Sequence, residues 1–264
     1  MEIKFENYNY NEKEINLELK EASIIGITGE NLQSFVQLLQ IKELKKGQLL
    51  VNGEKITKDT VFDISRKISW LPQDLKIPFF VKTVEDLMIH IIETNRLTMK
   101  DAKKKIEDSL KIVGLQPSKY LSTELSYLSE SEKSLLRYSL SLLSNPEIII
   151  IEEPFHHLDM KNEKKISMLF QRLKEQFKKT IIIISKNPNT LYQYAEEMIM
   201  IKNDNILVSG PTKDIYLRVD YLKKNKFDIP DIVKFTYLAK KQKNVKIDYH
   251  KDVRDIIKDI YKHV

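Results

Sequence analysis

The chain has 264 residues, of which 42% are hydrophobic and 31% are charged. This length and balance exclude disordered and fibrous classes of protein and predict one large folded domain, with or without a small addition. The formal net charge is +6, but the two signs are interspersed as on solvated helix faces, so we expect no nucleic-acid partner.

The N-terminal part of the chain reads as strands with one helix. Alternating or apolar runs bounded by turn residues predict strands, in chain order, at 2–8, 14–20, 22–29, 48–56 (a hairpin around Asn52-Gly53) and 66–74. Residues 31–46 follow a strand that ends in glycine and carry apolar residues at close to helical spacing. A strand that feeds a helix through glycine predicts a β-loop-α unit.

The rest of the chain alternates helical patterns with two long apolar runs. Helical spacing recurs at 84–113, 129–144 and 161–178, and as three short stretches within 212–264. The β-branched runs at 147–151 and 180–185 are typical of strands that are buried on both faces of a parallel sheet, and a last hairpin is predicted at 197–210. Strands joined by helical crossovers predict an α/β fold with a mixed, mostly parallel sheet.

Cysteine content and apolar run length indicate a location. There is no cysteine, which excludes disulfides and thiolate chemistry and fits a reducing compartment. The first 14 residues lack the segments of a signal peptide, and the longest apolar runs are too short to span a membrane. We therefore expect a cytoplasmic protein.

Two adjacent acids, Glu152 and Glu153, follow the apolar run at 147–151, and Asp159 lies a few residues later. A buried strand that delivers acids at its carboxyl end can place one beside Mg²⁺ and the other toward an attacking water. An ordinary loop of solvated acids would look the same, so this pattern alone leaves both interpretations open.

The surrounding motifs resemble those of the ATP-binding-cassette (ABC) ATPases. Residues 121–159 read LSTELSYLSESEKSLLRYSLSLLSNPEIIIIEEPFHHLD, which is similar to the family's order of Leu-Ser-Gly-Gly-Gln signature, helix, Asn-Pro and Walker B strand. The resemblance implies a P-loop NTPase-like α/β fold with N-terminal antiparallel strands. It implies an ABC ATPase domain at 1–211, a helical subdomain within it at about 80–145, and a helical extension at 212–264.

The same resemblance implies site residues, position by position. Glu153 would be the catalytic acid, Gln73 the Q-loop residue and Lys186 the residue at the switch-histidine position. Glu152 and Gln73 would hold Mg²⁺. The ATP-binding positions would be Tyr10 against adenine, Gly26, Gly29, Asn31 and Ser34 at the phosphate loop, Ser129 in the signature toward a partner's site, and Asp159 in the D-loop.

Three of these motifs depart from the family pattern. The phosphate loop lacks its lysine. If the loop is aligned without a gap, Phe35 occupies the lysine position and Val36 occupies the position of the Ser or Thr whose hydroxyl binds Mg²⁺. If the loop is instead about three residues shorter, Ser34 lies near that hydroxyl position. The signature has lost both glycines and gained two acids, Glu130 and Glu132, and Lys186 replaces the switch histidine. We therefore expect binding of ATP and Mg²⁺ to be weak or absent.

The C-terminal stretches at 210–216, 222–241 and 250–261 resemble the helical extension of energy-coupling-factor (ECF) ATPases. That resemblance implies an ATP-binding subunit of an importer for vitamins or metal ions, at the inner face of the membrane. A second ABC ATPase subunit would pair with it, as a heterodimer or homodimer, beneath a membrane T subunit and a substrate-binding S subunit. A soluble pseudo-ATPase that regulates or scaffolds, and a working ATPase with an altered loop, are alternatives that the sequence leaves open.

Two contacts are also predicted. Lys186 should form a salt bridge with Glu153 or Glu152, because two acids without a cation would be costly to bury. The family resemblance further implies that residues 73–83 receive a helix of the membrane subunit, with Phe79 and Phe80 as apolar anchors. The alternative is that both rings lie in the core.

Overall fold

The structure, a computed structural model, describes residues 1–97, 100–243, 248, 250 and 253–263. A small antiparallel sheet has the order β2-β1-β4-β5, with β1 (Ile3–Tyr10), β2 (Lys13–Leu19), β4 (Gln48–Val51) and β5 (Glu54–Lys55). The hairpin predicted at 48–56 is confirmed as β4-β5, and the strands predicted at 2–8 and 14–20 form the antiparallel pair β1-β2.

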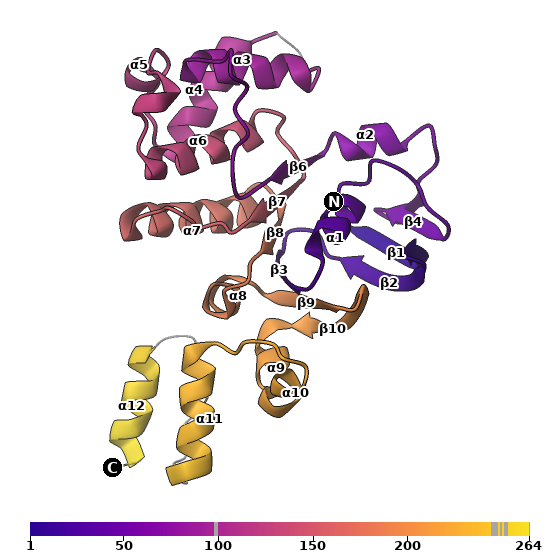
Figure 1. Cartoon of the computed structure of the whole chain (residues 1–264), viewed down its shortest axis with the longest axis vertical. Helices are drawn as coiled ribbons and strands as arrows, with labels where there is room; N and C mark the ends of the chain where they lie inside the picture. The colour runs from indigo at the N-terminus through magenta and orange to yellow at the C-terminus, as the bar shows by residue number, and fades with distance from the viewer. Residues whose placement is uncertain (98–99, 244–247, 249, 251–252, 264) are drawn as a thin grey trace.

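The central sheet has six strands in the order β10-β9-β3-β8-β7-β6 (Figure 1). Strands β3, β6, β7, β8 and β9 are parallel to one another, and β10 pairs with β9 in the antiparallel direction. The bounds are β3 (Ile24–Gly29), β6 (Ile68–Leu71), β7 (Ile148–Glu152), β8 (Thr180–Ile184), β9 (Glu197–Lys202) and β10 (Asn205–Pro211). The predicted mixed, mostly parallel sheet is confirmed.

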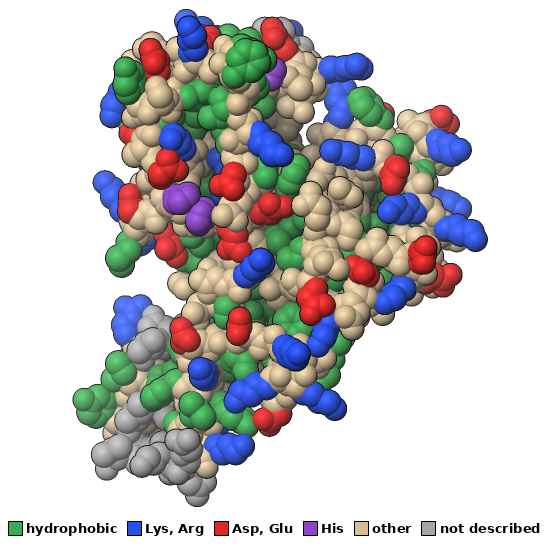
Figure 2. Space-filling view, in the orientation of Figure 1, with side chains coloured by type: hydrophobic (Ala, Val, Ile, Leu, Met, Phe, Trp, Pro, Cys, Tyr) green, Lys and Arg blue, Asp and Glu red, His purple; other side chains and the backbone are tan. Residues whose placement is uncertain are grey.

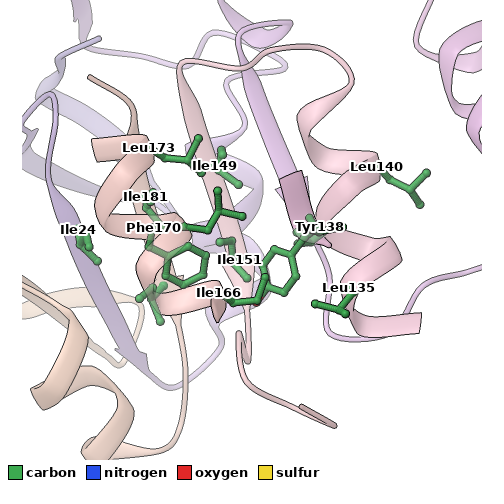
Figure 3. Packing of buried hydrophobic residues seen from close by; sticks show 14 of the residues in the cluster. Ile24, Leu135, Tyr138, Leu140, Ile149, Ile151, Ile166, Phe170, Leu173 and Ile181 are labelled. Carbon is green, nitrogen blue, oxygen red and sulfur yellow. The ribbon is translucent and has the colours of Figure 1, made fainter. Parts of the chain in front are cut away.

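Both faces of this sheet are covered, which explains its uninterrupted isoleucine runs. Ile149 and Ile181 belong to the core beneath the helices, where they pack near Phe170 (Figure 3). Their neighbours Ile148 and Ile182 point to the other face, toward the small sheet and helix α1 (Leu32–Leu39). Helix α1 is shorter than the predicted 31–46 because the chain leaves the helix after Leu39, and Ile41 has a φ of 50°.

The remaining helices form three groups. Between β4 and β7 lie α2 (Val61–Ser65), α3 (Val84–Thr94), α4 (Ala102–Val113), α5 (Pro117–Tyr120), the 3-10 helix η1 (Leu125–Tyr127) and α6 (Glu130–Leu142), most of them at the upper left of Figure 1. The crossover helices are α7 (Met160–Glu175) and α8 (Pro188–Tyr194). After β10 follow α9 (Thr212–Tyr216), α10 (Val219–Lys224), α11 (Asp231–Lys243) and α12 (Val253–His263).

This C-terminal group differs from the three stretches that the sequence predicts, because its described residues form four helices. Figure 1 shows α11 and α12 side by side at the end of the molecule farthest from α3. None of the described helices combines the length and the apolar composition that crossing a membrane requires.

Candidate functional site

The carboxyl ends of β7 and β8 place the predicted acids and the switch position at one edge of the central sheet. Parallel pairing puts Glu152 opposite Ile184, so Glu153 lies beside the residues that follow β8. Glu152 accepts hydrogen bonds from the Trp70 indole nitrogen at 3.1 Å and from the Gln73 backbone N–H at 3.4 Å. The structure therefore brings together Glu152 and Gln73, the two residues predicted to hold Mg²⁺.

Glu153 is bound to the turn after β8. Its carboxylate accepts from the Ser185 hydroxyl and from the Lys186 backbone N–H, both at 2.8 Å. Its own backbone N–H donates to the Ile184 carbonyl at 2.8 Å. Both carboxylate oxygens thus have neutral donors.

The predicted salt bridge of Lys186 is wrong. No ion pair within 4.0 Å joins its ammonium group to Glu152 or Glu153, and its side chain is exposed. The acids do not need this cation because hydroxyl, indole and backbone N–H groups satisfy them instead.

Two substitutions test whether Glu153 is held by the Ser185 hydroxyl and a backbone N–H or by a salt bridge with Lys186. Glu153→Ala should lower the free energy of unfolding by about 2 kcal/mol, since it leaves the buried Ser185 hydroxyl without its acceptor. Lys186→Ala should change it by less than about 0.5 kcal/mol, because only the backbone of Lys186 is used. Urea unfolding of both variants measures this. If Lys186→Ala lowers the free energy of unfolding as much as Glu153→Ala does, the result would support a salt bridge between the two side chains.

The connection between β3 and α1, where a phosphate loop is predicted, has only two residues, Glu30 and Asn31. The Glu30 backbone N–H donates to the Ile201 carbonyl of β9 at 3.1 Å. Asn31 is left-handed, with a φ of 52°, and its side chain does not cap the helix. In this short connection one of the two amides is therefore already hydrogen-bonded to β9.

The glycines of this region serve close packing. A Cβ on Gly29, whose φ is 144°, would lie 2.0 Å from the Ile201 carbonyl oxygen. Gly26 lies inside β3, where a Cβ would come within 2.9 Å of Ala195. The predicted phosphate-loop role of Gly26 is therefore a mistaken placement, because this glycine allows α8 to approach the sheet.

Tyr10 does not have the exposed ring that adenine stacking requires. Its side chain is 0% exposed and packs edge-on against Phe35, with ring centroids 5.4 Å apart. Its hydroxyl is within 2.9 Å of the Ser34 hydroxyl, which also donates to the Asn31 carbonyl at 3.1 Å. Burial raises the pKa of Tyr10. The predicted roles of Tyr10 and Ser34 toward ATP do not fit these positions, because both groups are used within the fold.

The residue at the ungapped lysine position also points inward, since Phe35 is 0% exposed. Two acids lie near the connection: Glu30 is exposed, and Asp204 is 3.5 Å from the Asn31 side-chain amide. Negative charge here would repel a phosphate.

The signature segment forms the N-terminus of α6, which is capped by side chains of the segment itself. Ser129 caps α6, and Glu132 accepts from the Ser129 backbone N–H at 2.9 Å, which makes a capping box. The Tyr120 hydroxyl also donates to Glu132, and this bond, followed by those from Ser129, lowers the pKa of the Glu132 carboxyl. Glu130 is exposed and paired with Lys133 at 2.8 Å.

Asp159 joins the signature helix to α7. It caps α7 by accepting from the Asn162 backbone N–H at 2.8 Å, and the Ser131 hydroxyl donates to it at 3.4 Å. Asp159 and the signature segment therefore lie together, although Ser129, among the described residues, forms hydrogen bonds only within the first turn of α6.

Arg137 is a residue of this edge that the sequence reading did not single out. Its side chain is 2% exposed, and its guanidinium donates to the carbonyls of Pro72, Gln73 and Glu153. Its Nε atom has no hydrogen-bond partner among the described residues. The signal was available, because Arg137 is the only charge between 134 and 144.

Two more side chains of α6 bind the chain that follows Glu153. The Tyr138 hydroxyl donates to the Pro154 carbonyl, and the Ser134 hydroxyl donates to the His156 carbonyl at 3.1 Å. Together with Arg137, they fasten α6 to the segment after β7.

The residues of this edge do not match a bound ATP–magnesium group. The two-residue connection supplies no lysine, and its Glu30 amide is already bonded. Glu152 and Gln73 have oxygen atoms suited to Mg²⁺, but these atoms are acceptors and cannot replace the missing donors to phosphate.

Comparison with known proteins gives one family match. Residues 12–156 match the description of the ABC transporter family. The chain is 28% identical over 209 residues to the energy-coupling factor transporter ATP-binding protein EcfA1 of Streptococcus mutans, which covers 79% of this chain and 74% of that protein. It is 25% identical over 272 residues to EcfA2 of Clostridium acetobutylicum, and this match covers 96% of this chain and 93% of that protein.

Solved structures show the same fold. The structure of cbiO1 from Clostridium perfringens, described as part of the ABC transporter complex cbiONQ, has a TM-score of 0.67 at 21% identity and covers 89% of this chain and 98% of that chain. The ATP-binding cassette MJ0796 bound to ADP and Pi has a TM-score of 0.63 at 22% identity, covering 80% and 98%. These likenesses confirm the P-loop NTPase-like fold.

Proposed function

The chain belongs to the ABC transporter family, since the family match spans more than half of its length, and on this premise we propose that it is a catalytically degenerate cassette subunit of an ECF-type importer for vitamins or metal ions. Its relatives named EcfA1 and EcfA2 support the ECF assignment. In this role it pairs with a second cassette subunit and sits at the inner face of the membrane beneath T-type and S-type subunits. It supplies docking surfaces, and the partner cassette supplies nucleotide chemistry.

The two-residue connection between β3 and α1 is the observation that carries the degenerate part of the proposal. A triphosphate needs several backbone amides and a cation at this place. Here Glu30 and Asn31 offer an acid, a left-handed turn and one amide already bonded to β9. Productive binding of MgATP by this chain alone is therefore not expected.

The signature segment supports the same proposal from the other side of a cassette pair. The carboxylate of Glu132 occupies the start of α6, and Glu130 adds an exposed acid. A partner's nucleotide that approached this helix would meet negative charge where a binding site needs free N–H groups.

Phe79 and Phe80 support docking of a membrane subunit. Phe79 is 98% exposed and Phe80 is 60% exposed, so the alternative that both rings lie in the core is wrong. The rings contact each other edge-on, with centroids 5.6 Å apart, and Phe80 also lies against His90 of α3. Exposed aromatic pairs of this kind are common anchors of protein interfaces.

Changing both Phe79 and Phe80 to serine should abolish co-purification with the membrane partner, because loss of one such anchor costs about 2 kcal/mol or more of binding free energy. The test co-expresses the chain with the membrane T-type subunit and the second cassette subunit that the proposal assigns to it. The melting temperature should stay within a few degrees, because neither ring is buried.

Phe177→Ser, in the turn between α7 and β8, is a control for loss of an exposed aromatic ring, since Phe177 is 54% exposed and lies outside 73–83. Unchanged co-purification of the double variant would contradict docking through this surface. Failure of the unmodified chain to co-purify with any membrane protein would favour the soluble regulatory module instead.

A further inference from the structure

Pro72 and Gln73 form the turn that follows β6, and side chains of two other elements hold this turn. From β7, one oxygen of Glu152 accepts from the Gln73 backbone N–H at 3.4 Å, and the other accepts from the Trp70 indole N–H at 3.1 Å. From α6, the Arg137 guanidinium donates to the Pro72 carbonyl at 2.8 Å and to the Gln73 carbonyl. Trp70, Glu152 and Arg137 thus form a clamp around the turn.

Arg137 is a buried cation that binds backbone groups. It is 2% exposed, and its guanidinium forms no ion pair within 4.0 Å with a described residue. Burial of such a charge costs folding free energy, although the acidic side chains that gather across the middle of the molecule offset part of the cost (Figure 2). Folding alone therefore does not explain this residue. Its planar fork of N–H donors can hold several carbonyl groups in one geometry, which an apolar side chain of similar size cannot.

The clamp holds one end of the exposed segment 73–83. At the other end of this segment, the Leu125 N–H donates to the Lys82 carbonyl at 2.8 Å. Phe79 and Phe80 face the solvent between these two points. The direction in which the segment leaves β6, and with it the position of the two rings, therefore depends on the clamp.

We infer that Trp70 and Arg137 are positioning residues that, through Glu152 and the turn, fix the segment 73–83 without nucleotide or Mg²⁺. Both oxygens of Glu152, the acid predicted to hold Mg²⁺, already accept from N–H groups of the chain itself. These N–H groups do the work of a bound cation, which would also draw the turn onto β7. The inference deepens the proposed function and rests on it for what the segment docks to, whereas the clamp belongs to the isolated chain.

The test follows two protons by NMR of the isolated, 15N-labelled full chain, one at each oxygen of Glu152. The first is the indole N–H of Trp70, which gives a single signal because the chain has no other tryptophan, and the second is the backbone N–H of Gln73. Their exchange with solvent is compared with that of the Ile150 and Ile182 amides inside β7 and β8. These interior amides report the opening of the whole domain.

Arg137→Met should speed exchange of the Gln73 amide roughly tenfold or more relative to the interior amides, because it removes both carbonyl contacts of the turn. Arg137→Lys should restore part of the protection, since it keeps the charge but not the planar fork. Tyr138→Phe is the matched control, because it removes a neighbouring buried donor of α6 that binds the Pro154 carbonyl instead of the turn. It should leave the Gln73 amide unchanged relative to the interior amides.

Glu152→Gln loosens the clamp from the other side and serves as the test if Arg137→Met does not fold. A side-chain amide accepts through one oxygen only, so either Trp70 or Gln73 must lose its acceptor. Exchange of at least one of these two N–H groups should rise roughly tenfold or more. Unchanged exchange of both would overturn the inference.

Addition of about 10 mM Mg²⁺ and about 1 mM ATP to the unmodified chain should leave the Trp70 indole signal in place. A saturable shift of this signal would overturn the inference, and so would equal acceleration of the Gln73 amide by Arg137→Met and Tyr138→Phe. Equal acceleration would remove the clamp and leave the proposed function standing. Nucleotide binding without a shift would contradict the degenerate part of the proposed function and leave the clamp standing.

Discussion

Gly29→Ala should reduce the free energy of unfolding by about 2 to 6 kcal/mol, since a positive φ costs a residue with a side chain about 1 to 3 kcal/mol and overpacking adds a similar amount. The φ of Gly29 is 144°, and its new Cβ would lie 2.0 Å from the Ile201 carbonyl oxygen of β9. A backbone oxygen cannot move aside like the end of a long side chain. Urea unfolding, with the midpoint and slope compared between variants, measures the loss.

Gly53→Ala is the control for the backbone contribution alone. Gly53 also has a positive φ, 81°, but nothing lies within 4 Å of its added Cβ. Its loss should be near 1 kcal/mol. If Gly29→Ala lowers the free energy of unfolding no more than Gly53→Ala does, then β9 does not approach Gly29 as closely as described. Contact with a phosphate would then be the better explanation for a glycine at position 29.

The strands of the central sheet could be predicted because their signal is local. An unbroken run such as 148–151 has no polar face, so it fits only a strand covered on both sides, as found. The end of α1 could not be predicted in this way, because residues 40–46 keep a helical pattern. The chain nevertheless turns at Ile41, which is 1% exposed in the core.

The candidate site was predictable in its position but not in its contacts. Motif order placed Glu152, Glu153 and Gln73 at one sheet edge, since parallel strands end together. The partners of Glu153 depend on a turn 32 residues away, at Ser185, and a side chain such as Lys186 was a more obvious partner than a backbone N–H. Tertiary packing also decides that Tyr10 is buried.

We expect weak nucleotide binding because donors to phosphate are missing. Each charge-assisted hydrogen bond to phosphate contributes about 1.5 to 3 kcal/mol. Loss of the lysine and of two loop amides therefore removes about 4.5 to 9 kcal/mol, which is more than a thousandfold in affinity. Glu30 and Asp204 oppose binding further, because no cation pairs with them within 4.0 Å among the described residues.

Equilibrium titration of the isolated chain with a fluorescent ATP analogue and Mg²⁺ tests the central claim most directly, with EcfA1 of Streptococcus mutans as the positive control. The account predicts no saturable signal below about 1 mM nucleotide. It predicts the same for the Phe79, Phe80 double variant, because these two residues lie outside the connection between β3 and α1. A dissociation constant in the low micromolar range, with displacement by unlabelled ATP, would contradict it and would show a working site built on an altered loop.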